Sequence, residues 1–206
     1  MIGIVGGVGS GKSSVISGLA GFSLQIIDAD RIGHQLLLRP EIRAALTTHF
    51  GPAILNAAGE IHRPALAAIV FGDTPAQQAA RETLNQIVRP GIRAEILRQL
   101  QHTPPHIDAV ILDAALLLES GLDQLCDHLI FIDTPEQLRS RRTTDSRGWS
   151  PEELRRRELS QWPLDRKRAA CSHSIDNSGS LAAATSQLQQ LLQEFLHQPV
   201  TSPTAE

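Results

Sequence analysis

The sequence predicts a three-layer α/β fold with a five-stranded parallel sheet. Five short apolar runs, at residues 2–5, 24–27, 109–112, 129–132 and more weakly 174–175, are separated by helical stretches. Strands that alternate with helices are typical of a parallel sheet covered on both faces. The chain has 206 residues, of which 41% are hydrophobic and 20% are charged. It is therefore long enough for one such domain with insertions.

The first apolar run leads into a glycine-rich segment that fits G-x-x-x-x-G-K-S/T. Its residues are Gly6, Gly7, Val8, Gly9, Ser10, Gly11, Lys12 and Ser13. Glycines let the backbone approach phosphates closely, while successive N–H groups and a helix N-terminus supply partial positive charge. In this pattern the lysine reaches the β- and γ-phosphates, and the serine hydroxyl is placed to ligate Mg²⁺. The segment, extended to Ser14, predicts an ATP and Mg²⁺ site in a P-loop NTPase.

The elements after this loop complete the expected core. Residues 13–20 read as a helix closed by Gly21. Carboxylates follow the four later strands, and ligands of parallel sheets bind at this carboxyl edge. They are Asp28 and Asp30, Asp113, Asp133, and Asp176. We expect some of them to serve as helix caps or turn residues instead.

A helical insertion is expected at about residues 31–105, with Pro104-Pro105 at its exit. Its apolar residues recur at helical spacing: Ile42, Ala45, Leu46 and Phe50, then Leu84, Ile87, Val88, Ile92, Ile96, Leu97 and Leu100. The insertion is too long for a simple crossover and predicts an acceptor-binding subdomain. A last helix is expected at 180–197, with Leu181, Leu188, Leu191, Leu192 and Phe195 on its apolar side. The tail 198–206, rich in Pro, Thr and Ser, is expected to be disordered.

Charge is concentrated in one segment of an otherwise nearly neutral chain. Net charge is −3, yet residues 139–168 hold ten Arg or Lys and five Asp or Glu. Such a block suits a solvated helix face, a nucleic-acid patch or a phosphate-facing lid. No aromatic interleaving accompanies it, so we expect no nucleic-acid partner and favour the lid. The expected plan is one kinase domain at 1–197, with its core at about 1–30, 106–138 and 169–197, and a lid at about 139–168.

Composition also bears on location. No apolar run reaches the length of a membrane span, so no membrane partner is expected. Cys126 and Cys171 stand 45 positions apart, without a C-x-x-C or a disulfide framework. This usage suits a reducing cytosol, and the first residues show no export signal, so we expect a cytoplasmic protein.

Features outside the loop narrow the class of P-loop protein. No N-K-x-D guanine-reading motif occurs, and the chain is short for a motor with coupling domains. An early carboxylate pair, a helical insertion and a basic late segment are instead the parts of a kinase that encloses a small acceptor.

Several segments together match one family. They are I-D-A-D-R-I-G-H-Q at 27–35, R-x-x-L-x-x-x-V-F at 63–71, D-x-x-L-L-x-E at 113–119, and a closing group of Gln161, Lys167 and I-D-N-S-G at 175–179. With the glycine loop, they resemble the dephospho-coenzyme A kinases over about residues 1–195. The departures are Ala115 for the usual Pro, Arg89 for the usual His before Pro90, Ser172 for a common Asp, and a lid about two residues longer than usual.

The resemblance implies transfer of the ATP γ-phosphoryl group to the ribose 3′-hydroxyl of dephospho-coenzyme A, giving coenzyme A and ADP. Asp30 is then the candidate to accept the hydroxyl proton, with a helix N-cap as the alternative. Asp113 would hold Mg²⁺ together with Ser13, or would only order the loop. Glu119 is a candidate for the acceptor site, with a structural role as an equal alternative.

The remaining site candidates are cations and one amide. Arg142 and Arg147 are the catalytic lid candidates, because guanidinium groups bind phosphoryl oxygens bidentately. Arg63 and Arg93 are candidates for the acceptor's phosphates, with pairing on a helix surface as an equal interpretation. Asn177 would approach the adenine or would turn the chain into the last helix. Two other functions stay open: a kinase of another small acceptor, such as a nucleoside monophosphate or sugar acid, and a non-catalytic ATP-binding regulatory module.

Overall fold

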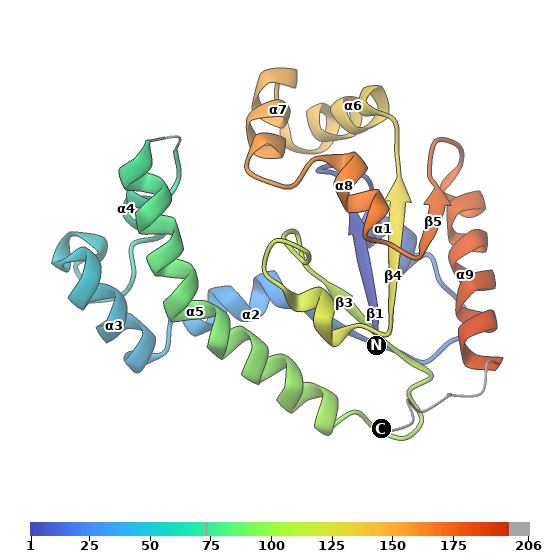
Figure 1. The fold of residues 1–206 in the computed structure, drawn as a ribbon, viewed down its shortest axis with the longest axis horizontal. Helices are drawn as coiled ribbons and strands as arrows, with labels where there is room; N and C mark the ends of the chain where they lie inside the picture. Colours follow the sequence, from blue (N-terminus) through green and yellow to red (C-terminus); the bar gives the residue numbers. More distant parts are fainter. Residues whose placement is uncertain (73, 198–206) are drawn as a thin grey trace. The chain divides into compact units, whose positions relative to one another are not determined.

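The computed structural model describes residues 1–72 and 74–197 (Figure 1). The tail at 198–206, expected to be disordered, lies outside the described residues. The chain forms two compact units: one contains Met1–Ile27 and the chain from Thr103 onward, and the other is Asp28–His102. Each unit has its own core and is described separately below.

All five predicted strands are confirmed, and they form one sheet in the order β2-β3-β1-β4-β5. Their bounds are β1 Ile2–Gly6, β2 Leu24–Asp28, β3 Ala109–Asp113, β4 His128–Asp133 and β5 His173–Asp176. β1 pairs in parallel with both β3 and β4, and β4 pairs in parallel with β5. The central position of β1 explains its apolar sequence, because all five of its residues are buried. The loop that follows β1 therefore starts from the middle of the carboxyl edge.

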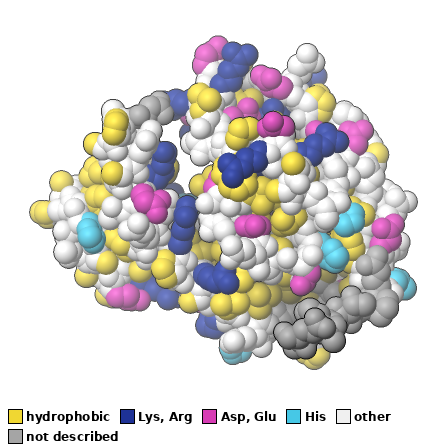
Figure 2. Space-filling model, in the orientation of Figure 1, with side chains coloured by type: hydrophobic (Ala, Val, Ile, Leu, Met, Phe, Trp, Pro, Cys, Tyr) yellow, Lys and Arg dark blue, Asp and Glu magenta, His cyan; other side chains and the backbone are white. Residues whose placement is uncertain are grey.

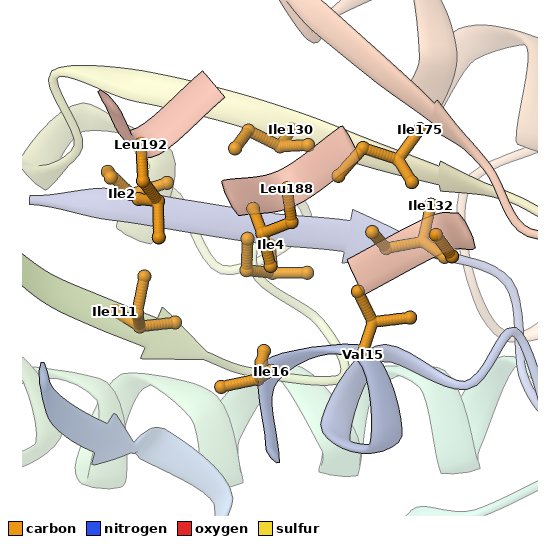
Figure 3. Close-up of a cluster of buried hydrophobic side chains, with 11 residues drawn as sticks. Ile2, Ile4, Val15, Ile16, Ile111, Ile130, Ile132, Ile175, Leu188 and Leu192 are labelled. Carbon is orange, nitrogen blue, oxygen red and sulfur yellow. The ribbon is translucent and has the colours of Figure 1, made fainter. Parts of the chain in front are cut away.

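The helices of the first unit are α1 Lys12–Ser17, α6 Glu136–Arg147, α7 Pro151–Leu159, α8 Leu164–Ala169 and α9 Leu181–His197, with a short 3₁₀ turn η2 at Leu122–Leu125. α1 and α9 pack against β1, β3, β4 and β5 through one buried cluster (Figure 3). Its members are Ile2, Ile4, Val15, Ile16, Ile111, Ile130, Ile132, Ile175, Ala184, Leu188 and Leu192. All buried members of this cluster are aliphatic.

Two details of these helices differ from the sequence expectation. α1 ends at Ser17 with Gly18 as its C-cap, so the prediction that Gly21 closes it is wrong. A Cβ at Gly18 would lie 2.6 Å from Thr185 Oγ1 of α9, so the close approach to α9 requires glycine at this position. In α9, Leu188 and Leu192 are fully buried as predicted, whereas Leu181 is 46% exposed. The first turn of α9 thus extends beyond the core.

The second unit is helical, with α2 Ala29–Leu36, α3 Pro40–Phe50, a 3₁₀ turn η1 at Pro52–Ile54, α4 Arg63–Val70 and α5 Pro75–Gln101. Its core consists of Leu46, Ile54, Leu66 and Val70, against which partly buried residues of α3, α4 and α5 pack. α5 begins with a capping box formed by Thr74 and Gln77 and continues through Pro90. On α5, Ile96 is fully buried, but Leu97, also expected on the apolar face, is 39% exposed.

Glu95 on α5 anchors a small ionic cluster in this unit. Its carboxylate accepts hydrogen bonds from Arg98 Nη2 at 2.7 Å and Gln99 Nε2 at 3.0 Å, and lies 3.6 Å from Arg39 Nη2. The hydrogen bonds from Arg98 and Gln99 lower the pKa of Glu95 from 4.5 to about 2. A carboxyl group with a lowered folded-state pKa stabilises the fold above its unfolded pKa, and this contribution is lost as the pH falls.

We therefore expect Glu95→Gln to lower the free energy of unfolding at pH 7 by about 1 kcal/mol or less, because Arg98 is largely exposed. Urea unfolding at pH 7 and at intervals from pH 4.5 down to 2 should show the difference from the unsubstituted protein shrinking over that range. Glu82→Gln on the same helix is the control. A difference that stays constant with pH would contradict the assignment.

Candidate active site

The glycine segment forms a loop between β1 and α1, so the predicted order of strand, loop and helix is confirmed. Gly9 and Gly11 have φ of 73° and 81°, a region that favours glycine. At Gly9 a Cβ would also lie 2.7 Å from Thr143 Cγ2 and 2.9 Å from the Arg139 carbonyl oxygen. Both the backbone conformation and the space around it therefore require glycine at this position.

Three side chains hold the loop by one atom, the carbonyl oxygen of Ser10. It accepts hydrogen bonds from Asn177 Nδ2 at 2.8 Å and Thr134 Oγ1 at 2.9 Å, and a longer one from Arg142 Nη1 at 3.4 Å. Asn177 and Thr134 are buried, at 1% and 5% exposure. Asn177, expected near the adenine or in a turn, thus fixes the shape of the phosphate loop.

Arg139 at the start of α6 is a further support of the loop that sequence reasoning missed. It is 3% exposed, and its Nε donates to the Thr134 carbonyl oxygen at 3.0 Å. Its Nη1 contacts the Val8 carbonyl oxygen at 3.5 Å and pairs with Glu158 of α7. Burial lowers the pKa of the Arg139 guanidinium, and the negative charges of Glu136 and Asp133 oppose this shift. In the sequence this arginine is one of ten cations in a basic segment, so no local signal distinguishes it.

A cavity of about 510 Å³ lies against the loop within the first unit. Loop residues 9–14 form one side, and α6 contributes Arg142 and Arg147. The rest of the lining consists of Thr143, Asp145, Ser146, Asn177 and the exposed Leu181. The structure therefore brings both predicted lid arginines to the cavity that the phosphate loop lines.

The other arginines of the basic segment divide differently. Arg155 pairs with Glu136, while Arg156 and Arg157 both pair with Glu153 on the surface of α7. Figure 2 shows basic and acidic side chains interspersed over the region of α6, α7 and α8. For these residues the interpretation as a solvated helix face is the better one, because they form exposed ion pairs on the helix surface. Such pairs contribute little to the stability of the fold.

Lys12 and Ser13 stand at the first turn of α1. Lys12 Nζ lies 3.5 Å from the Gly6 carbonyl oxygen and 3.4 Å from that of Gly7. Ser13 Oγ donates to Asp113 Oδ2 at 3.3 Å, which joins α1 to the end of β3. The predicted partners Ser13 and Asp113 are thus brought together, and they offer oxygen atoms, the donors that Mg²⁺ prefers. Within residues 1–72 and 74–197, no three His, Cys, Asp or Glu side chains form a metal-binding group.

Two other strand-end carboxylates have local roles. Asp133 pairs with Arg168, with Oδ2 2.6 Å from Nη1. Hydrogen bonds from the Ser178 hydroxyl and N–H lower the pKa of Asp176 below its usual value. Asp176 thus has the expected role of a turn residue, whereas the ion pair of Asp133 was not predicted.

Glu119 lies in a buried network of residues that carried the family resemblance. Its Oε1 accepts from Lys167 Nζ at 3.0 Å and from the Trp162 N–H at 2.7 Å. Lys167 is 2% exposed and also donates to Gln161 Oε1 at 2.7 Å. The network ties the segment after β3 to α8, which favours the structural interpretation of Glu119.

The second unit has a cavity of about 670 Å³ between α2, α4 and α5. Its lining is mostly apolar, with His34, Arg63 and Arg89 among the polar exceptions. Arg63 Nη2 lies 2.9 Å from His34 Nε2. Arg63 and Arg89, at the position where the resembling family has His, thus share one cavity. Arg93, the other predicted phosphate ligand, is exposed and does not line it.

Asp30 lies in the first turn of α2 and is exposed. The N-cap of α2 is Asp28, whose Oδ1 accepts from the Arg31 N–H at 2.8 Å. The alternative in which Asp30 caps this helix is therefore wrong. Asp28 caps the helix, and Asp30 does not.

The fold and the glycine loop define a P-loop nucleotide-binding protein. The dephospho-CoA kinase family model matches residues 1–183. The chain is 34% identical over 197 residues to the dephospho-CoA kinase of Geobacillus kaustophilus (94% of this chain, 96% of the relative). It is 36% identical over 203 residues to that of Idiomarina loihiensis (95% of each). The chain belongs to the dephospho-CoA kinase family, whose members are ATP-dependent kinases of coenzyme A biosynthesis.

Solved structures agree with this assignment. A crystal structure from Thermus thermophilus aligns with a TM-score of 0.78 at 30% identity, over 94% of this chain and 96% of that one. The dephospho-CoA kinase from Campylobacter jejuni aligns with a TM-score of 0.66 at 26% identity, with the same coverage. Within the described residues 1–72 and 74–197, no helix has the length and apolar character needed to cross a membrane.

Proposed function

We propose that this chain transfers the γ-phosphoryl group of ATP to the ribose 3′-hydroxyl of dephospho-coenzyme A, giving coenzyme A and ADP in the last step of coenzyme A biosynthesis. The observation that carries the proposal is the cavity of the first unit, which the phosphate loop lines together with Arg142 and Arg147. The lining holds one lysine and two arginines against one carboxylate, that of Asp145, and this positive balance suits a triphosphate whose charge spreads during transfer.

In this proposal the first unit binds and orients the donor. Backbone N–H groups of the loop and Lys12 hold the phosphates, while Arg142 and Arg147 neutralise charge on the transferred group. Asn177 acts by keeping the loop in shape. The segment 139–168 serves as a lid that excludes water, since water would compete with the acceptor hydroxyl.

We infer that Ser13 and Asp113 hold Mg²⁺, because a hydroxyl and a carboxylate oxygen already meet there. When bound, the ion supplies positive charge to the phosphate oxygens of the nucleotide. The hydrogen bond from the Ser13 hydroxyl to Asp113 Oδ2 keeps both oxygen atoms at the edge of the loop.

We infer that the second unit binds the acceptor. Its cavity combines apolar walls with Arg63 and Arg89, which suits a ligand that carries both an aliphatic chain and phosphates.

Asp30 would accept the hydroxyl proton. In a parallel sheet β1 and β2 end at the same edge, and Asp30 follows the end of β2 by two residues. We further propose that the protein is cytoplasmic, because Cys126 and Cys171 are both free thiols, as is usual in a reducing compartment.

The test is an acceptor panel in which ADP release from Mg-ATP is measured with dephospho-coenzyme A, with nucleoside monophosphates, with sugar acids and without acceptor. We expect ADP to form with dephospho-coenzyme A and 3′-phosphorylated product to accumulate in equal amount. Equal turnover with a nucleoside monophosphate would identify a kinase of another acceptor. Tight ATP binding with no phosphorylated acceptor would identify a non-catalytic module.

A further inference from the structure

The turn between α6 and α7 folds back on the end of α6. α6 ends at Arg147, and Gly148 follows with φ of 66°, which reverses the chain direction. The Trp149 carbonyl oxygen then accepts from Thr144 Oγ1 at 2.8 Å, and the Trp149 N–H reaches the Thr143 carbonyl oxygen at 3.4 Å. These backbone contacts fix the base of the Trp149 side chain against the last turn of α6.

The indole ring of Trp149 lies against two guanidinium groups. The Cζ atom of Arg147 is 4.7 Å from the ring centroid, and that of Arg157 is 4.0 Å from it. Both distances are within the range of a cation–π interaction. Arg157 is held in turn by Glu153, whose Oε1 accepts from Arg157 Nε at 2.8 Å. The ring is therefore supported from α7 and is available to hold Arg147.

The two lid arginines are held in different ways. Arg142 donates to the carbonyl oxygens of Ser10 and Asn177, so the loop and the chain after β5 fix its position. Arg147 lines the same cavity but lies on the Trp149 ring instead. An exposed arginine has many rotamers, and ordering it when the nucleotide binds costs free energy. A contact that restricts Arg147 beforehand reduces this cost.

We propose that Trp149 is a positioning residue that holds the Arg147 guanidinium at the nucleotide cavity. The inference rests on the proposed phosphotransfer function and deepens it. Arg147 contacts the phosphates, and Trp149 acts only through Arg147. Because the cation–π contact is partly exposed, its removal is expected to change kcat/KM for ATP by about two- to fivefold.

A double-mutant cycle tests the proposal. We expect Trp149→Leu to lower kcat/KM for ATP by about two- to fivefold, and Trp149→Phe, which keeps an aromatic face, to restore most of the loss. In an Arg147→Gln background, Trp149→Leu should cause no further loss. Arg155→Gln, an exposed arginine on α7, is the control. Additive effects of Trp149→Leu and Arg147→Gln would overturn the proposal, because Trp149 would then act independently of Arg147.

A second measurement does not depend on the acceptor. The chain has two tryptophans, so Trp162→Phe leaves Trp149 as the single indole fluorophore. We expect ATP to change Trp149 emission as Arg147 engages the phosphates, and Arg147→Gln to abolish most of that change. An identical change with and without Arg147 would overturn the proposal. Failure of the proposed function would appear separately, as ATP-dependent emission with no transfer to dephospho-coenzyme A.

Discussion

Asp30→Asn should lower kcat with dephospho-coenzyme A by about 10²- to 10⁴-fold, the usual contribution of a general base. The amide cannot accept the hydroxyl proton at neutral pH, but it keeps the size and polarity of the carboxylate. ATP affinity should stay within about twofold, since the backbone amides of the phosphate loop bind the phosphates whatever side chain stands at position 30. Steady-state kinetics, together with isothermal titration of ATP, measures both quantities.

Asp28→Asn is a matched control for this variant. Asp28 precedes Asp30 by two residues and caps α2, and asparagine is an equally good N-cap. The Asp28→Asn variant should therefore retain activity and unfold at the same temperature as the unsubstituted protein. A fully active Asp30→Asn enzyme would remove Asp30 from the role of base, whereas a loss of activity in Asp28→Asn would mean that the cap, not the proton transfer, limits the reaction.

Lys12→Ala should weaken ATP binding by about 10- to 100-fold and lower kcat by about 10²- to 10³-fold, because a charged donor to the phosphates is lost in both the ground and transition states. The effect differs in kind from that of Asp30→Asn, in which binding is spared. Equilibrium titration with ATP and single-turnover kinetics separate the two effects.

Lys12→Arg keeps the positive charge and tests whether geometry matters. A guanidinium is larger and planar, so it should restore part of the binding and little of the turnover. Thermal unfolding without nucleotide is the control for a folded protein, and it should remain a single cooperative transition in both variants. Unchanged ATP affinity in Lys12→Ala would contradict the placement of the phosphates in this loop.

The parts of the fold that depend on local pattern could be predicted from the sequence. Apolar runs bounded by polar residues located all five strands, including the weak one that became β5. The glycine spacing located the loop, because a φ of 73° at Gly9 leaves few alternatives to glycine. The pair of Ser13 and Asp113 followed from the rule that parallel strands end at one edge.

Features that depend on tertiary contacts could not be predicted in this way. The need for glycine at the C-cap Gly18 comes from Thr185, more than 160 residues later in the chain, which leaves no space for a Cβ. The burial of Arg139 and its pairing with Glu158 require two helices to meet, and in sequence this arginine resembles its neighbours. The assignment of the α2 cap to Asp28 rather than Asp30 depends on where β2 ends, and element boundaries are weakly encoded.

The three donors on the Ser10 carbonyl oxygen have a consequence for the peptide unit between Ser10 and Gly11. Rotating that unit would leave the buried Thr134 hydroxyl and Asn177 amide without their acceptor, at a cost of about 1–3 kcal/mol for each group. The amide at Gly11 therefore keeps one direction before any ligand arrives. The loop backbone is therefore already ordered when a nucleotide binds, so the free energy of binding is reduced little by the cost of ordering this backbone.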